Sequence, residues 1–430
     1  MSVTSQPNAA PPPAQGAAAA ARPAAQAVVR ALLDEHRPGH CLPGPMYHDP
    51  AVHAADLDLV WHREWVFAGH ECELAEPGAY ITLTVGTHPL VVVRGTDGVL
   101  RALHNVCRHR GAVLCEAPSG NTRRKLVCPY HQWAYELDGS LYKARAMPPG
   151  MTPSELGLRP AHVGTASGLV FVCVADTPPP FEPFAATVAA HLAPFDLAGA
   201  KIAHESVLVE QGNWKLVMEN NRECYHCRIS HPELAKSFPL APLHSGGGSE
   251  DEARATAEVV AACEAAGVPS GFLMSDDFQY RVMRMALEHA RSMTMDGEPA
   301  VAHRWAGLPG EDVVRDVGDV LLYHYPSMWS HYVGDHALTF RMLPTGPTTT
   351  ELRTTWLVPG DAVEGEDYDL KTLTEVWLAT NDQDTALVER TQRGVTSPAF
   401  VPGPYSEVEE DGVIQFVAWY TERLRAGLGG

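Results

Sequence analysis

Two short motifs in this chain carry one cysteine and one histidine each, residue types that bind metals. The first motif is Cys107-Arg-His109, and the second is Cys128-Pro-Tyr-His131. Two thiolates can bind one iron of a [2Fe–2S] cluster while two imidazoles bind the other iron, and the histidines raise the reduction potential of such a cluster. We therefore expect these four residues to bind a [2Fe–2S] cluster that transfers electrons.

A zinc site is the alternative for the same four side chains. Zinc sites with two cysteines and two histidines favour a pair of cysteines followed by a pair of histidines. Here each motif supplies one residue of each type. This arrangement favours the two-iron cluster over zinc, because each iron takes two ligands of one kind, one from each motif.

A second group of candidate metal ligands contains His226 and His231. Two histidines and one carboxylate on one face of an iron leave open positions, as in non-haem Fe(II) oxygenases. A spacing of five residues places these histidines about 140° apart on a straight helix. They can share an iron only if the helix breaks, and Pro232 disfavours helical geometry at His231.

The carboxylate has to come from another segment, and we look for it on a helix expected at residues 367–393. Asp384 falls within the apolar stripe of that helix, with Trp377 and Val388, whereas Asp382 points away. A buried carboxylate needs a cation or a hydrogen-bond partner, so a buried salt bridge is the alternative to metal ligation. We expect Asp384 to be the third iron ligand.

Three further residues surround His226. Cys224 and Cys227 form a C-x-x-C motif, which can be a redox disulfide or half of a zinc site. We expect both to be free thiols that pack in the interior. Glu223 precedes His226 by three residues, on the same face if this segment is helical. Its carboxylate could accept the imidazole N–H, or it could be a solvated charge.

The composition limits the classes of partner and compartment. Lys and Arg total 32 against 52 Asp and Glu, a formal net charge of −20. This charge argues against nucleic acid or an anionic membrane as the main partner. We find no apolar run long enough for a membrane span. Nine cysteines and no secretory signal indicate a reducing compartment, so we expect a cytoplasmic protein.

Composition and hydrophobic pattern divide the chain into four parts. We expect a disordered Ala/Pro-rich tail at 1–38, with a short helix starting near Ala24, and a segment at 39–69 that packs on the catalytic domain. Residues 70–178 read as a small all-β domain with the cluster motifs, and residues 179–430 as the catalytic domain.

The larger domain mixes helices and strands, with a flexible Gly/Ser connector at 245–249. The predicted fold is therefore α+β, a small all-β domain beside a helix-grip-like domain in which helices cover an antiparallel sheet. The predicted helices of this domain are 182–197, 213–228, 252–266, 367–393 and 408–427, and its predicted strands are 320–325, 337–343 and 351–358.

From about residue 40 to 425 the chain resembles the large (α) subunit of the Rieske-type non-haem iron oxygenases. Within this family it most resembles the members that act on quaternary amines, the glycine betaine monooxygenases. The segments that carry the resemblance are 63–70, 107–111, 126–133, 213–217, 219–227, 292–297, 381–384, 392–394 and 402–406.

The resemblance implies a role for each candidate residue. The cysteines and histidines of the two motifs would bind the Rieske cluster, and His226, His231 and Asp384 would bind a mononuclear Fe(II). Glu223 would bridge an iron histidine and a cluster histidine of a neighbouring subunit in a homotrimer. Electrons from NAD(P)H would arrive through a separate flavin/iron–sulfur reductase, and O2 would be the co-substrate.

The resemblance also implies the reaction, N-demethylation of glycine betaine to dimethylglycine and formaldehyde. Alternatives are a proline betaine demethylase and a carnitine or choline monooxygenase, and a different class is a Rieske electron carrier without mononuclear iron. A quaternary ammonium has no N–H donor, so aromatic faces must recognise it. The candidates for this cage, unless they only fill the core, are Tyr323, Tyr325, Trp329 and Tyr332.

Overall fold

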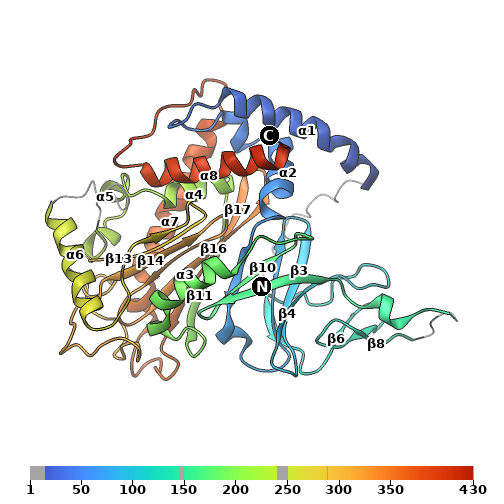
Figure 1. The fold of residues 1–430 in the computed structure, drawn as a ribbon, viewed down its shortest axis with the longest axis horizontal. Helices are drawn as coiled ribbons and strands as arrows, with labels where there is room; N and C mark the ends of the chain where they lie inside the picture. Colours follow the sequence, from blue (N-terminus) through green and yellow to red (C-terminus); the bar gives the residue numbers. More distant parts are fainter. Residues whose placement is uncertain (1–14, 146, 148–149, 240–249, 288, 430) are drawn as a thin grey trace, which may run out of the picture.

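The computed structural model describes the chain except for residues 1–14, 146, 148–149, 240–249, 288 and 430 (Figure 1). Two seven-stranded sheets and one three-stranded sheet form its framework, with helices packed on the second large sheet. The predicted α+β fold is confirmed. The connector predicted at 245–249 lies outside the described residues.

The first large sheet and the three-stranded sheet build the small all-β domain. The order in the large sheet is β1-β10-β9-β4-β3-β2-β5. Its edge strand β1 lies almost entirely in the segment 39–69, which we predicted to pack on the catalytic domain. The strands are β1 Val66–His70, β2 Ala79–Val85, β3 His88–Arg94, β4 Leu100–His104, β5 Ser119–Asn121, β9 Pro160–Ala166 and β10 Leu169–Cys173, with β6 Leu126–Val127, β7 Ala134–Tyr135 and β8 Leu141–Lys143 in the small sheet.

The second large sheet is antiparallel throughout, in the order β11-β17-β16-β15-β14-β13-β12. All three strands predicted in this region are present, as β14, β16 and β17, whereas the others were missed. The strands are β11 Lys201–Glu210, β12 Leu273–Met274, β13 Tyr280–Met285, β14 Asp319–His324, β15 Met328–Tyr332, β16 Ala337–Gly346 and β17 Thr349–Val358.

Helices pack against this sheet, and α4 contacts both α7 and α8 (Figure 1). The predicted helix at 213–228 is shorter than expected and ends at Asn221, so the metal-ligand candidates follow it. The helices are α1 Gln15–Glu35, α2 Pro50–Asp56, α3 Glu182–Leu192, α4 Trp214–Asn221, α5 Cys227–Ser230, α6 Glu250–Ala265, α7 Leu370–Val395 and α8 Asp411–Leu428.

The short helix predicted from near Ala24 is present within α1, which already begins at Gln15, so the prediction of a disordered tail at 1–38 is wrong from residue 15 to residue 35. Val29, Leu32 and Leu33 are buried. Their spacing of three and four residues places them on one face of the helix, which packs into the same core as α8. None of the described helices is both long and apolar enough to cross a membrane.

A buried polar network fixes α4 in position. The carboxylate of Asp56, at the end of α2, accepts hydrogen bonds from Lys215 Nζ (2.5 Å), Trp214 Nε1 (3.0 Å) and the Tyr420 hydroxyl (2.6 Å). The Asp56 and Lys215 side chains are both fully buried. This network ties α2 and α8 to the first turn of α4, the helix that leads into the candidate site.

Candidate metal centre and substrate pocket

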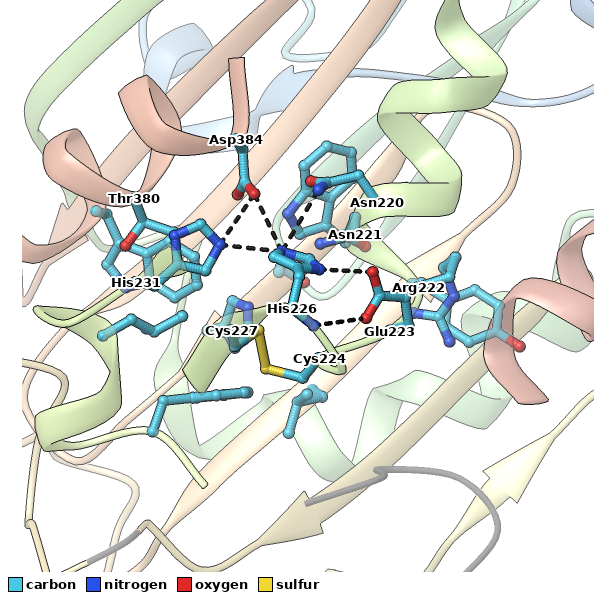
Figure 2. Close-up of a pocket in the computed structure, with 18 of the residues that line it drawn as sticks. Asn220, Asn221, Arg222, Glu223, Cys224, His226, Cys227, His231, Thr380 and Asp384 are labelled. Carbon is cyan, nitrogen blue, oxygen red and sulfur yellow. Dashed lines mark hydrogen bonds and ion pairs between the residues drawn. A yellow bond between two sulfur atoms is a disulfide. The ribbon is translucent and has the colours of Figure 1, made fainter. Parts of the chain in front are cut away.

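His226 and His231 flank the short helix α5, and their imidazoles meet. His231 has φ −124° and ψ 70°, outside the helical region, so the helix breaks there as Pro232 predicts. The two Nε2 atoms are 3.0 Å apart. Asp384 Oδ1, from the middle of α7, lies 3.3 Å from His226 Nε2 and 3.0 Å from His231 Nε2 (Figure 2).

These three donor atoms fit a metal ion. Two imidazole nitrogens and a carboxylate oxygen point at one another, and such a set of lone pairs needs a cation between them. Cys227 Sγ also lies within 4.8 Å of both imidazoles. It bonds to Cys224, however, so it offers no thiolate. The donor set available to a metal is therefore two histidines and one carboxylate, the residue types that non-haem iron sites use.

The electrostatics of the site agree with a cation. Burial alone would lower the pKa of His226, but hydrogen bonding to Asp384 and Glu223 outweighs burial and raises this pKa to about 9. Burial would raise the pKa of Asp384, whereas the two histidines lower it. The carboxylates thus stabilise positive charge at the point where the three donor atoms meet.

Each imidazole is oriented by a second hydrogen bond. The Nδ1–H of His226 donates to Glu223 Oε1 (2.5 Å), and the Nδ1–H of His231 donates to Gln383 Oε1 (2.9 Å). Gln383 Nε2 in turn donates to Glu233 Oε2 (2.7 Å), which fixes the orientation of the amide. Protons on both Nδ1 atoms leave the Nε2 lone pairs for a metal. Sequence reasoning missed Gln383, although it directly precedes Asp384.

Glu223 reaches His226 through a turn and not along a helix face as predicted. Its carboxylate accepts hydrogen bonds from the backbone N–H of Tyr225 and of His226 as well as from the imidazole. The reason is that α4 has already ended at Asn221. The predicted contact between Glu223 and His226 is nevertheless present, and the carboxylate is only partly buried.

The prediction that Cys224 and Cys227 are free thiols is wrong, because they form a disulfide. The turn between α4 and α5 brings their Cα atoms to 4.9 Å, within the range that a disulfide spans. Free thiols were one argument for a reducing compartment, and this bond weakens that argument.

Glu210, at the end of β11, is a further carboxylate near the centre. It is buried, and its Oε2 has no hydrogen-bond partner among the described residues. Burial, together with the negative charges of Asp384 and Glu389, raises the pKa of Glu210 to about 8. The side chain is therefore largely protonated at pH 7.

The structure also brings together the four residues of the two Cys/His motifs. Cys107 and Cys128 are buried, whereas His109 and His131 are exposed, with ring centroids 4.7 Å apart. Burial and the neighbouring Cys107 thiol raise the pKa of Cys128. Two adjacent thiols beneath two adjacent imidazoles match the donor set of a [2Fe–2S] cluster with mixed ligands.

Tyr135 supports this second centre, and sequence reasoning missed it. The backbone N–H of Arg108 donates to the Tyr135 hydroxyl (3.0 Å), so the hydroxyl proton can point to Cys107 Sγ, 3.3 Å away. Hydrogen bonds to cysteine sulfurs tune the reduction potential of iron–sulfur clusters.

A cavity of ≈ 70 Å³ adjoins the His226–His231–Asp384 group. Of the four aromatic residues predicted to form a cage, Tyr323 and Trp329 line this cavity, whereas Tyr325 and Tyr332 do not. Tyr325 follows β14 and packs on Phe416 and Trp419. Tyr332 packs on Phe195 in a different core cluster, because alternate residues of β15 face opposite sides of the sheet.

Comparison with known protein families gives a separate match for the small all-β domain and for the larger domain. Residues 64–163 match the Rieske [2Fe-2S] domain, and residues 197–426 match the catalytic domain of the ring hydroxylating alpha subunit. The glycine betaine monooxygenase oxygenase subunit of Chromohalobacter salexigens is 43% identical over 92% of this chain and 88% of its own length. That of Pseudomonas aeruginosa is 43% identical over 90% of each chain.

Solved structures show the same fold at lower identity. A quaternary ammonium Rieske monooxygenase in complex with L-carnitine has a TM-score of 0.67 at 22% identity and covers 89% of this chain and 96% of its own. Naphthalene 1,2-dioxygenase from Rhodococcus has a TM-score of 0.66 at 18% identity, covering 94% and 98%. The chain therefore belongs to the Rieske-type ring-hydroxylating oxygenases, as an alpha subunit that carries both the Rieske domain and the catalytic domain.

Proposed function

We propose that this enzyme N-demethylates glycine betaine to dimethylglycine and formaldehyde, using O2 and electrons that a separate NAD(P)H-dependent reductase supplies. The observation that carries the proposal is the identity of 43% over 90% or more of the chain to glycine betaine monooxygenase oxygenase subunits. The geometry agrees with it, because a two-histidine, one-carboxylate donor set lies beside a small cavity.

The cavity beside the donor set is small. An engineered cavity of roughly 150 Å³ accommodates a benzene molecule. The cavity here is ≈ 70 Å³, about half of that volume. Glycine betaine has more non-hydrogen atoms than benzene, so it also requires this pocket to widen, and the size of the cavity alone does not separate it from an aromatic substrate. In this proposal Trp329, which lines the cavity and stacks on Phe340, is the aromatic residue that meets the quaternary ammonium, a group with no N–H donor of its own.

In this proposal His226, His231 and Asp384 hold Fe(II), and the four residues of the Cys/His motifs hold the Rieske cluster. When bound, the iron supplies the activation of O2 for hydroxylation of an N-methyl C–H bond. Gln383 and Glu223 keep the protons on the Nδ1 atoms of the two histidines. An N-hydroxymethyl ammonium product then loses its hydroxyl proton, and its C–N bond breaks to give formaldehyde and a neutral tertiary amine.

We also propose a homotrimer in which Glu223 connects the two centres of neighbouring subunits. The carboxylate touches His226 and is not fully buried, and the cluster histidines His109 and His131 are exposed. Glu223→Gln should retain both metal centres, but electron transfer from the reduced cluster should be slowed in single-turnover measurements. Unchanged single-turnover kinetics would exclude this role of Glu223.

The test of the proposed function is turnover of four substrates with a compatible reductase: glycine betaine, proline betaine, carnitine and choline. We expect stoichiometric formaldehyde and dimethylglycine from glycine betaine. A different preferred substrate would replace the proposal by that alternative, and no oxidation of any of them would refute the quaternary-amine assignment.

Iron content separates an oxygenase from an electron carrier. We expect about three irons per chain, two in the cluster and one between the histidines and Asp384. Asp384→Asn should lose the single iron and keep the cluster spectrum. Asp382→Asn, an exposed position on the same helix, is the matched control and should keep all the iron. Two irons per chain in the wild type would support the electron carrier.

A further inference from the structure

Two buried arginines line the pocket of the metal centre. Arg281 is 1% exposed and Arg222 is 5% exposed, and both contribute to the wall that also contains His226, His231 and Asp384. Figure 2 shows Arg222 and Asp384 on opposite sides of His226. We infer that Arg281 and Arg222 bind the carboxylate of the substrate, so that the pocket takes a zwitterion in one orientation. The inference rests on the proposed function and names the recognition group for it.

The two guanidinium groups gather around one aromatic ring. Arg222 Cζ lies 4.0 Å from the ring centroid of Tyr323, and Arg281 Cζ lies 5.0 Å from it. Planar guanidinium groups present several N–H donors in a fixed geometry that matches a carboxylate. The stacking on Tyr323 holds both groups at the same part of the pocket.

The register of the sheet explains why these side chains share one wall with Trp329. Arg281 on β13 pairs with Tyr323 on β14, and Tyr323 pairs with Trp329 on β15. Directly paired residues of antiparallel strands project to the same face. The row therefore has the cation of Arg281 at one end, Tyr323 in the middle and the aromatic ring of Trp329 at the other end. The cation matches the carboxylate of a betaine, and the aromatic ring matches its trimethylammonium group.

Electrostatics favour an anion between the arginines. Burial, followed by the like charge of Arg222, lowers the pKa of Arg281 to about 9, which still leaves it protonated at pH 7. Asp411, at the start of α8, is one carboxylate whose charge acts on both arginines. A substrate carboxylate placed between the two guanidinium groups would offset both their mutual repulsion and the cost of burying them.

The Tyr323 hydroxyl provides an independent sign of a polar ligand. Tyr323 is 1% exposed and lines the pocket, yet its hydroxyl has no hydrogen-bond partner among the described residues. Buried hydroxyl groups in folded proteins nearly always have a partner. A carboxylate held by Arg222 and Arg281, which stack on the same ring, would lie where this hydroxyl can donate to it.

The experiment separates the carboxylate from the ammonium by using isosteres in which carbon replaces the ammonium nitrogen. 3,3-Dimethylbutanoate has the shape of glycine betaine with carbon in place of nitrogen, so it keeps only the negative charge. 3,3-Dimethylbutan-1-ol is the corresponding isostere of choline and carries no charge. Binding of both to the iron-loaded enzyme is measured by calorimetry, which requires no turnover.

We expect Arg281→Gln to weaken binding of the acid by about 10- to 100-fold and to leave binding of the alcohol within about 3-fold. Tyr323→Phe is a milder change and should weaken binding of the acid by about 3- to 10-fold. Arg284→Gln is the matched control: it lies on the same strand and is buried, but Arg284 Nε donates to Ser270 Oγ (2.8 Å) outside the pocket. Its affinity for the acid should equal that of the wild type.

Three results would overturn the inference. The first is that the wild-type enzyme does not bind the acid. The second is that Arg281→Gln binds the acid as tightly as the wild type does. The third is that Arg281→Gln weakens binding of the acid and binding of the alcohol equally. If Arg281→Gln does not fold, Tyr323→Phe and Arg222→Gln decide by the same comparison. Failure of the proposed function looks different, since wild-type enzyme would then release no formaldehyde from glycine betaine while isostere binding stays measurable.

Discussion

Replacing Asp56 by asparagine should destabilise the protein strongly, because it leaves the Lys215 ammonium buried without a counter-charge. Both side chains are fully buried, and Asp56 accepts three hydrogen bonds from α4 and α8. Removing one partner of a buried ion pair costs about 3–5 kcal/mol. An asparagine keeps the shape, but its amide group would present N–H donors to the ammonium. We expect a loss of about 4 kcal/mol in the free energy of unfolding.

Urea unfolding followed by tryptophan fluorescence measures this loss, and Trp214 within the network is a local reporter. A loss of about 4 kcal/mol corresponds to a shift of the urea midpoint by roughly 1 M. The double variant Asp56→Leu/Lys215→Met removes both charges and should recover much of the stability. Asp97→Asn breaks an ion pair of similar length (2.7 Å to Arg101) on the surface and should leave the midpoint unchanged.

Two outcomes would refute the reasoning. The first is a loss below about 1 kcal/mol for Asp56→Asn, which would mean that water reaches Lys215 or that the pair contributes nothing. The second is a double variant that costs as much as the sum of its single substitutions, since independent residues add.

Three further predictions concern the surroundings of the metal centre. The pKa of Glu210 is higher in the folded protein than in the unfolded chain, so its contribution to stability is fully present below about pH 4.3 and is lost as the pH rises towards 8. In the wild type this residue should change the free energy of unfolding by about 3 kcal/mol between pH 5 and 8, and Glu210→Gln should remove that change. If the urea midpoint of Glu210→Gln falls with pH as much as that of the wild type, the prediction is wrong. Thiol titration of the denatured protein should give seven thiols, and all nine only after reduction of Cys224–Cys227; nine without reduction would exclude the disulfide. Gln383→Leu removes the acceptor for His231 Nδ1 and should lower iron affinity by about 10- to 100-fold in chelator competition, and unchanged affinity would show that the amide does not support the imidazole.

The residues of the two candidate metal centres could be found in the sequence because they carry local signals. Each Cys/His motif is contained within a few residues, and Pro232 marks the break that frees His231 from the helix. Asp384 was found through the apolar stripe of α7, a helix long enough for its periodicity to be read. These predictions needed no knowledge of which strands pair.

The substrate end of the pocket could not be predicted in the same way. The row of Arg281, Tyr323 and Trp329 exists only through the register of three strands, and two of these strands were missed. The dense aromatic segment around Tyr325 and Tyr332 was misread as one cage, because it crosses a turn and alternates between the faces of a sheet. The pairing of strands decides both which side chains share a wall of the pocket and which aromatic residues face it. A single sequence contains little information about that pairing.

The position of Asp384 along α7 has a mechanical consequence. The helix runs from Leu370 to Val395 and is about 39 Å long, and Asp384 lies about 2 Å from its midpoint. A tilt of 5° about that midpoint moves each end by about 1.7 Å but moves the backbone of Asp384 by only about 0.2 Å. The carboxylate proposed to bind iron therefore lies close to the pivot of such a tilt, and its backbone moves far less than either end of the helix.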